Sequence, residues 1–149
     1  MKVIIDTYST KYDSQVRTLI SEAIKVLNLP TSPGHDKDLD TIDEIYIGRG
    51  RFFLALIKEK VIGVVGLQEI DAHMARLKRM YVLSTYQGRG IGQLLFNTLL
   101  KFAREQRYQE IILTTHTNLK IAQRFYEKNG FEATASQGDV KYYKLKLSK

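Results

Sequence analysis

The chain has 149 residues, of which 44% are hydrophobic and 26% are charged, and it carries a formal net charge of +7 with no cysteine. This length and composition fit one domain with a buried core, and they exclude a disordered chain, a disulfide scaffold and a thiolate metal site. No apolar run approaches the roughly 20 residues of a membrane span, and the first ten residues lack the apolar stretch of a secretory signal. We therefore expect a cytoplasmic protein without membrane contact.

The excess of positive charge favours an anionic partner, which is nucleic acid, an acidic membrane surface or a phosphorylated ligand. The basic residues come singly or in small groups, such as Lys78 and Arg79, and no nucleic-acid fold signature accompanies them. We expect no nucleic-acid partner. Three scattered histidines also make a bound metal unexpected.

The first third of the chain predicts a strand, a helix and an irregular tract. Residues 2–7 have the β-branched density of a strand, and apolar residues recur at helical spacing from Asp13 to about Leu27. Asn28 and Pro30 end that helix. The tract 31–50 predicts a loop with a short helix around Leu39, Ile42 and Ile45.

The middle of the chain predicts three strands and a long helix. Two apolar runs, 51–58 and 61–67, are separated only by Glu59 and Lys60, which indicates a hairpin. A third strand covers about 75–82. After a glycine-rich turn, an amphipathic helix extends from Ile91 to about Gln106.

The last third predicts a buried strand, a helix and two more strands. Residues 110–115 form the strand and 119–128 the helix, which Asn129 and Gly130 close. Phe131 and the alternating segment 140–147 complete a terminal pair of strands. The whole order predicts one domain of the α/β (α+β) class over residues 1–149, with a mixed sheet flanked by helices.

The junction between the third strand and the long helix reads QGRGIG, residues 87–92. A glycine-rich turn that opens a helix presents unpaired backbone N–H groups to an anion such as phosphate. A dinucleotide fingerprint would need glycine where the chain has Gln93 or Leu95, and a Walker loop would need a G-K-[ST] tripeptide, which does not occur. Both alternatives fail.

With KRMYV before this turn, the sequence resembles the GNAT superfamily of N-acetyltransferases, in which a [Q/R]-x-x-G-x-[G/A] turn holds the pyrophosphate of acetyl-CoA. A second segment, AQRFYEKNGF at residues 122–131, is similar to the family's A-x-x-x-Y-x-x-x-G-F motif and follows one strand later. The alternative for both segments is a tight turn and a core helix in which Phe125 and Tyr126 only pack. The resemblance implies one N-acetyltransferase domain whose mostly antiparallel sheet splays between its fourth and fifth strands, with acetyl-CoA as co-substrate.

By this resemblance, the strand, the turn and the second motif bind acetyl-CoA. The implied residues are Met80, Tyr81, Val82, Gln87, Gly88, Arg89, Gly90, Ile91, Gly92, Asn118, Ala122 and Phe125. The family's asparagine falls on Leu119, so Asn118 takes its place if the loop before the helix absorbs one residue.

The resemblance also implies catalytic roles. A backbone N–H, expected at Val82, polarises the thioester carbonyl, and the Tyr126 phenol supplies a proton to the leaving thiolate. Many relatives carry glutamate where this chain has Arg76, and an arginine cannot accept a proton. Glu69, Asp71, His73 and His116 are the alternative bases, directly or through water, and His116 is the one expected to face the cleft.

Two features bear on the acceptor. Arg76 favours an acceptor with a carboxylate or phosphate beside its amine, whereas the acidic tract from Asp36 to Glu44 favours a cationic amine. For each, a solvated surface role is the alternative. Together they indicate a small amine or an amino-acid-like acceptor.

Other functions fit the same fold. The chain is an N-acetyltransferase for a small molecule, an enzyme that acetylates proteins or peptides, or a non-catalytic acyl-CoA-binding module. The terminal segment 140–147 either pairs across a homodimer or forms a hairpin within the chain.

Overall fold

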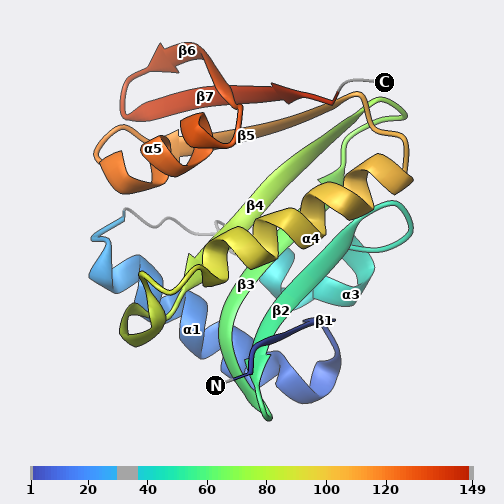
Figure 1. Cartoon of the computed structure of the whole chain (residues 1–149), viewed down its shortest axis with the longest axis vertical. Helices are drawn as coiled ribbons and strands as arrows, with labels where there is room; N and C mark the ends of the chain where they lie inside the picture. Colours follow the sequence, from blue (N-terminus) through green and yellow to red (C-terminus); the bar gives the residue numbers. More distant parts are fainter. Residues whose placement is uncertain (1, 30–36, 148–149) are drawn as a thin grey trace.

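The structure, a computed structural model that describes residues 2–29 and 37–147, is built on a seven-stranded sheet with the strand order β1-β2-β3-β4-β5-β7-β6 (Figure 1). The strands are β1 (Ile4–Thr7), β2 (Arg51–Ile57), β3 (Lys60–Glu69), β4 (Met74–Val82), β5 (Glu110–His116), β6 (Glu132–Gln137) and β7 (Val140–Lys146). The helices are α1 (Asp13–Val26), α2 (Lys37–Asp40), α3 (Ile42–Ile45), α4 (Ile91–Glu105) and α5 (Lys120–Lys128), with 3₁₀ turns η1 (Thr10–Tyr12) and η2 (Ser84–Tyr86). The pair β4 and β5 is parallel, and the pairs on either side of it are antiparallel. The predicted class and element order are confirmed.

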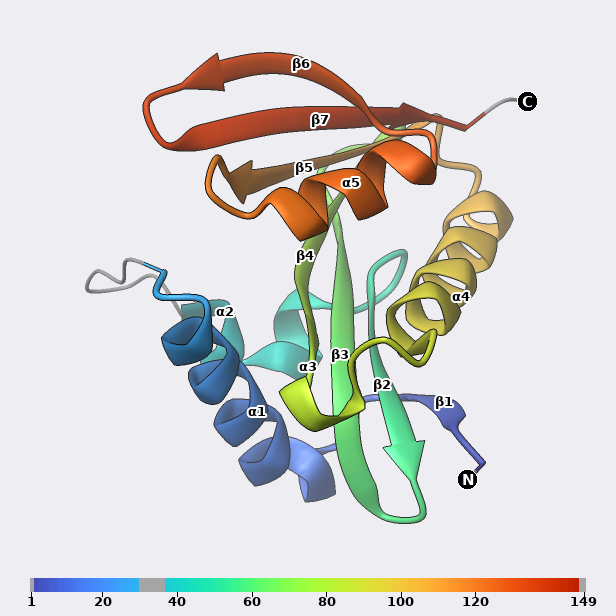
Figure 2. The same cartoon turned by 60° about the vertical axis from the view of Figure 1, so that its left-hand side comes forward.

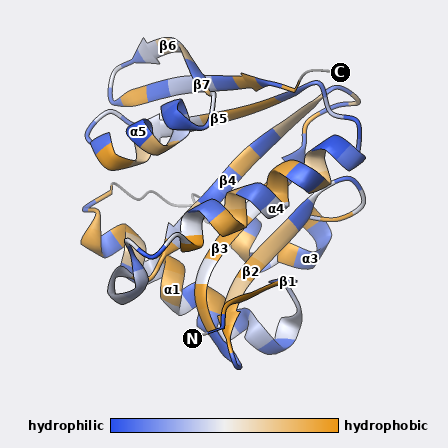
Figure 3. Ribbon diagram, in the orientation of Figure 1, coloured by the Kyte–Doolittle hydropathy of each residue, from blue (hydrophilic) through white to orange (hydrophobic). Residues whose placement is uncertain are grey.

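Helices cover both faces of the sheet. Figure 2 shows α1, α2 and α3 on one side of β2 to β4 and α4 on the other, with α5 beside β5 and β7. One buried cluster joins α1 and α3 to the sheet, and a second joins α4 and α5 to it. Because β2 and β3 are buried on both faces, their sequences are continuous apolar runs. In Figure 3, β2 is largely orange, whereas α4 alternates between blue and orange because only one of its faces packs on the sheet.

The helix ends follow the sequence signals. Asn28 has a φ of 54° and Gly130 a φ of 99°, so each takes the left-handed conformation that closes α1 and α5. Pro30 lies outside the described residues. The short helix predicted around Leu39, Ile42 and Ile45 is two helices, α2 and α3, because Thr41 leaves the helical region with a φ of −142°.

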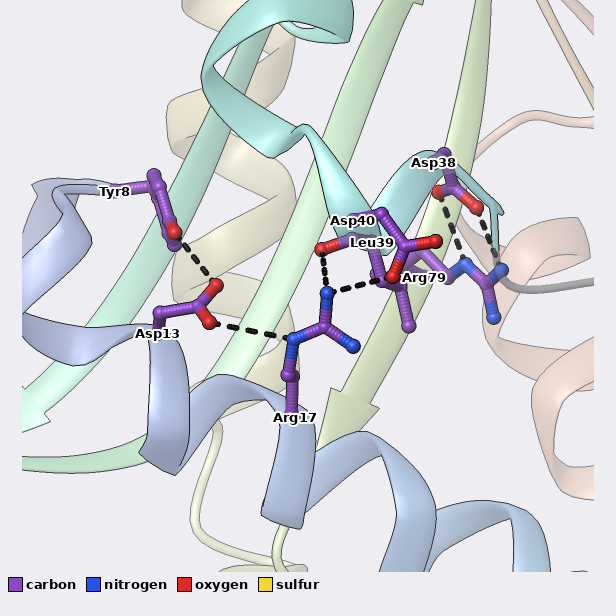
Figure 4. A network of polar contacts seen from close by, with 7 residues as sticks. All are labelled: Tyr8, Asp13, Arg17, Asp38, Leu39, Asp40 and Arg79. Atoms are coloured by element: carbon purple, nitrogen blue, oxygen red, sulfur yellow. Dashed lines mark hydrogen bonds and ion pairs between the residues drawn. The ribbon is translucent and has the colours of Figure 1, made fainter.

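A bulge in β4 is the main departure from the predicted regular strand. The register between β3 and β4 shifts between Val64 and Gly66, and Arg79 on β4 has a φ of 61°. Arg79 is buried, and its guanidinium donates to both carboxylate oxygens of Asp38 on α2, from Nη2 at 2.8 Å and from Nε at 3.2 Å (Figure 4). A left-handed arginine is costly, and this buried ion pair helps to hold it.

The sheet opens between β4 and β5. Only Met74–Arg76 pairs with β5, through residues 110–112, so the rest of β4 has no partner on that edge among the described strands. The predicted splay is therefore present. The terminal strand β7 pairs with β5 on one edge and with β6 on the other, which is the hairpin arrangement expected within one chain.

Within the part of the chain that the structure describes, no helix has both the length and the apolar character that crossing a bilayer requires.

Candidate active site

A cavity of about 920 Å³ lies at the opening between β4 and β5, a size within the roughly 300–1,000 Å³ typical of small-molecule sites. Its walls come from α1, the end of β4, the glycine turn, the start of α4, and the start of α5 with the loop before it. Of the residues expected to bind acetyl-CoA, the lining includes Met80, Tyr81, Val82, Gln87, Gly88, Gly90, Ile91, Gly92, Asn118, Ala122 and Phe125. Segments distant in the sequence thus meet at one site.

The glycine turn leaves the start of α4 open to a ligand. Gly88 and Gly90 have φ values of 78° and 80°, which an L side chain rarely adopts. Gly90 caps α4 without a side-chain hydrogen bond, and the first turn holds no acidic residue that would compete with an anion. At Gly92 a Cβ would lie 3.8 Å from Met80 Cε and would occupy part of the cavity. This cradle fits a pyrophosphate.

Gln87 closes the turn. Its side-chain amide donates to the carbonyl oxygen of Val82 at 3.1 Å, so it holds the turn against the end of β4. A role for Gln87 in positioning the backbone amides therefore has structural support in addition to the direct contact expected from the sequence.

The exposed edge of β4 supplies backbone groups to the cavity. Leu83 N–H donates to Ile62 on β3, and N–H groups alternate between the two edges of a strand, so the N–H of Val82 points away from β3 and into the opening. The Val82 carbonyl points the same way, as its bond from Gln87 shows. Val82 thus presents a donor where the sequence analysis placed the thioester carbonyl.

Tyr126 lines the cavity from α5. Burial raises the pKa of its phenol above the usual 10, and the Tyr81 phenol adds to this shift. Its ring packs edge-on against Phe125 and Phe131, each with centroids 5.7 Å away, so the side chain is held by the core. Tyr126 is therefore a fixed, protonated donor at neutral pH.

The loop before α5 places both candidates for the family asparagine. The helix begins at Lys120, and Asn118 and Leu119 both line the cavity. Gln123 fixes this loop because its amide donates to the carbonyls of His116 and Thr117. The one-residue offset thus leaves Asn118 at the cavity wall.

Two of the predicted site residues with positive charge lie outside the lining. Arg89 is exposed, and its guanidinium lies over the ring of Tyr86, 5.5 Å from the centroid. Arg76 lies on β4 at the last pair with β5, and its Nε is buried without a hydrogen-bond partner among the described residues. Arg76 faces the side of the sheet that also carries Lys78 and the Asp38 ion pair.

The candidate bases also lie outside the lining. Glu69 ends β3 and accepts a hydrogen bond from Arg49 at 3.2 Å. The cavity lies at the other end of β3, where Gly63 pairs with Val82, so Glu69 is about 20 Å away along the strand. His116 ends β5, where its Nδ1 accepts from the Asn118 N–H and its Nε2 lies 4.0 Å from Asp139. Asp71 and His73 lie next to Glu69, in the turn between β3 and β4, and they do not line the cavity either. Of the four candidates, only His116 adjoins residues that line the cavity.

The acidic tract does not wall the cavity where it is described; its first residue, Asp36, lies outside the described residues. Asp38 is buried against Arg79 and Tyr46, and Asp40 pairs with Arg17 of α1 at 2.8 Å (Figure 4). Neither aspartate lines the cavity. The ion pairs of Asp38 and Asp40 therefore attach α2 to the sheet and to α1.

The contribution of α1 to the cavity was not predicted from the sequence. The lining includes Leu19, Glu22, Ala23, Val26 and Leu27, which follow the helical spacing of one face. The apolar spacing predicted the helix but not which of its faces borders a cavity, and Val16, Leu19, Ile20 and Ile24 are buried in the core. The one signal was Val26, an apolar residue that lies beside the stripe at positions 16, 19, 20, 23, 24 and 27.

Comparison with known proteins identifies relatives on both sequence and structure. The sequence profile of the "Acetyltransferase (GNAT) family" matches residues 21–131. Human N-acetyltransferase 8 is 38% identical over 104 residues, which are 65% of this chain and 46% of that protein. The N-acetylaspartate synthetase of Xenopus tropicalis is 34% identical over 99 residues, 64% of this chain and 36% of that protein. The chain thus spans less than half the length of these two relatives.

Solved structures match along almost the entire chain. An acetyltransferase of the GNAT family from Staphylococcus aureus Mu50 superposes with a TM-score of 0.91 at 26% identity, over 99% of this chain and 100% of that one. An acetyltransferase from Streptococcus agalactiae 2603 superposes with a TM-score of 0.89 at 27% identity, over 97% of this chain and 98% of that one. The PaiA N-acetyltransferase of Thermoplasma acidophilum, solved with coenzyme A, shares the fold at 20% identity with a TM-score of 0.83.

Proposed function

Since the chain belongs to the GNAT family of acetyltransferases, we propose that it transfers an acetyl group from acetyl-CoA to the primary amine of a small molecule. The observation that carries this proposal is the meeting, in one cavity, of the open start of α4, the free edge of β4 and the buried Tyr126. The coenzyme A bound in the Thermoplasma relative supports the same ligand here. The name of the Xenopus relative, a synthetase of an acetylated amino acid, supports a small acceptor.

Acetyl-CoA would supply an activated acyl group as a thioester. The backbone amides of Gly90, Ile91 and Gly92 would bind its pyrophosphate, and the Met80–Val82 edge would pair with its pantetheine arm. Asn118, Ala122 and Phe125 would line the other side of that arm. Together these contacts hold the thioester beside the N–H of Val82.

The ammonium form of the acceptor must first lose a proton. We propose that this proton passes through water, with His116 as the candidate base nearest the cavity. In the transfer step, the neutral amine nitrogen forms a bond to the acetyl carbon while the bond from that carbon to sulfur breaks. The Val82 N–H stabilises the charge that develops on the carbonyl oxygen, and Tyr126 donates a hydrogen bond or a proton to the departing sulfur. The nitrogen, positively charged after the attack, then loses a second proton, which balances the proton that the sulfur gains and restores the Tyr126 phenol.

Release of CoA tests this function directly. The chain contains no cysteine, so a thiol reagent reports only the CoA that leaves acetyl-CoA. The acceptor panel contains polyamines, amino acids, aminoglycosides, aminophosphonates and short peptides, and CoA binding is measured in parallel by calorimetry. Release with a small amine supports the proposal, release only with peptides replaces it with a peptide acetyltransferase, and CoA binding without release favours the acyl-CoA-binding alternative. If the protein binds no CoA, the proposal that it uses acetyl-CoA is wrong.

A further inference from the structure

The wall of the cavity that α1 forms is a mostly apolar helix face with a single carboxylate. The residues of α1 that line the cavity lie at positions 19, 22, 23, 26 and 27, so they form one continuous stripe along the helix. Four of them are apolar, and Val26 and Leu27 remain 68% and 38% exposed. Across the opening, Ile121 on α5 also lines the cavity and is 78% exposed. Apolar side chains thus border the cavity from both sides.

Charge is distributed unequally across this cavity. Its charged lining residues are Glu22 on α1 and Lys120 and Lys128 on α5. The lysines suit a phosphorylated ligand and repel an ammonium group, whereas Glu22 attracts one. Among residues 2–29 and 37–147, Glu22 has no ion-pair partner. Its carboxylate is therefore available to a ligand.

Arg76 and the described residues of the acidic tract, which the sequence connected with the acceptor, do not supply a charged group to the cavity. Arg76 is outside the lining, and Asp38 and Asp40 are paired with Arg79 and Arg17. Glu22 is thus the carboxylate that the described residues bring to the cavity.

We propose that the acceptor is a primary amine attached to an apolar group, with its ammonium held by Glu22 and its apolar part packed on Leu19, Ala23, Val26 and Leu27. This inference rests on the proposed function and specifies its acceptor. A carboxylate beside the amine is not required, because no arginine lines the described cavity. The same contact would keep the amine on the α1 side, opposite the lysines of α5.

Phenethylamine and L-phenylalanine form the first test, because the two differ only by the carboxylate. Ethanolamine supplies a small polar amine of the same charge. We expect kcat/KM for phenethylamine to exceed that for ethanolamine by about tenfold, as burial of several methylene or ring carbons would give. We expect L-phenylalanine, which has the same apolar group, to be no better than phenethylamine. A preference for L-phenylalanine would show that a cationic residue such as Arg76 reads the acceptor and would overturn the proposal.

Variants of α1 form the second test. Glu22→Gln should raise KM for phenethylamine about fivefold or more with kcat changed much less, since one ion pair is lost. Val26→Ser should raise KM for phenethylamine about threefold and leave KM for ethanolamine unchanged. Glu132→Gln removes another exposed carboxylate, from β6 and outside the cavity, and should have no effect. Equal effects of Glu22→Gln and Glu132→Gln would contradict the role of Glu22.

A binding measurement separates this inference from the proposed function. Phenethylamine is titrated calorimetrically into the protein saturated with CoA, so no transfer is needed. Weaker binding to Glu22→Gln than to the original chain supports the inference even if no amine releases CoA. Identical binding to both overturns it even if the enzyme is active.

Discussion

Asp38 on α2 and Arg79 on β4 form a buried ion pair, 2.8 Å between Oδ1 and Nη2, at the one residue of β4 whose φ is positive. Tyr46 donates a further hydrogen bond to Asp38 Oδ2 at 2.6 Å. The pair therefore joins the segment after α1 to the strand whose next residues, Met80 to Val82, form the edge of the cavity.

Asp38→Asn should destabilise the protein by about 3–5 kcal/mol, because it leaves the Arg79 charge buried without its counter-charge. Asp40→Asn removes a carboxylate two residues away that pairs with Arg17 at a partly exposed site, so it should cost no more than about 1 kcal/mol. Urea denaturation followed by circular dichroism measures both. A loss below 1 kcal/mol for Asp38→Asn would show that the bulge forms without the pair.

Stability should also fall in acid through Asp38. Burial alone would raise the pKa of this carboxyl, but the hydrogen bonds from Arg79 and Tyr46 and the charge of Arg79 outweigh burial and lower it below the usual 3.8. A carboxyl with a depressed folded-state pKa stabilises the fold above its unfolded pKa, and this contribution is lost as pH falls through the folded value. We expect the free energy of unfolding to drop below about pH 4 and the drop to be smaller in Asp38→Asn. Parallel pH profiles for the two chains would contradict this.

Substitutions at two glycines should separate stability from ligand binding. Gly92→Leu places its Cβ at ordinary contact distance, 3.8 Å from Met80 Cε, and leucine favours a helix more than glycine does, so stability should change by no more than about 1 kcal/mol. The motif allows only glycine or alanine at this position, and the larger side chain extends into the cavity, so Kd for CoA should rise about tenfold. Gly138→Ala, in the turn between β6 and β7 with a φ of 59°, should lose about 1–2 kcal/mol of stability and keep its CoA affinity. Calorimetry and thermal unfolding measure the two effects, and unaltered CoA binding in Gly92→Leu would contradict the cradle.

Tyr126→Phe should lower kcat about tenfold or more with little change in CoA affinity, because it removes a positioned donor and leaves the ring contacts. Burial keeps the Tyr126 pKa above 10, so the original chain should show no loss of kcat between pH 7 and pH 9 from this group. Tyr143→Phe is the control, since Tyr143 is buried against Tyr126 but donates to Glu127 outside the cavity. Turnover that is unchanged in Tyr126→Phe would exclude its role as donor.

Two of the candidate bases should respond differently to alanine. His116→Ala should lower kcat/KM about tenfold or more, because its ring adjoins the cavity wall at Asn118. Glu69→Ala should leave kcat/KM unchanged and cost stability, since Glu69 bonds to Arg49 at the far end of β3. If neither variant lowers kcat/KM, neither residue is the base.

The sequence predicted the elements well because local signals decide them. The hairpin, whose turn lies at Lys58 and Glu59, one residue before the predicted pair, depends on residues within a few positions of one another, as do the left-handed Asn28 and the glycine turn. The bulge at Arg79 was not predicted, because its partner Asp38 is distant in the sequence, in an acidic tract expected either to attract the acceptor or to be solvated. The cavity face of α1 was missed for a similar reason: an apolar helix position has the same sequence pattern whether it faces a core or a cleft.

The short joint between β4 and β5 also determines how the molecule responds to mechanical load. Only residues 74–76 pair across it, whereas α4 and α5 are bridged on one side by Gln93 and Asn129, whose amides bond at 2.8 Å. A force that pulls β6 away from β1 loads this joint of three residue pairs, because β6 and β7 connect to β1–β4 within the sheet through β5.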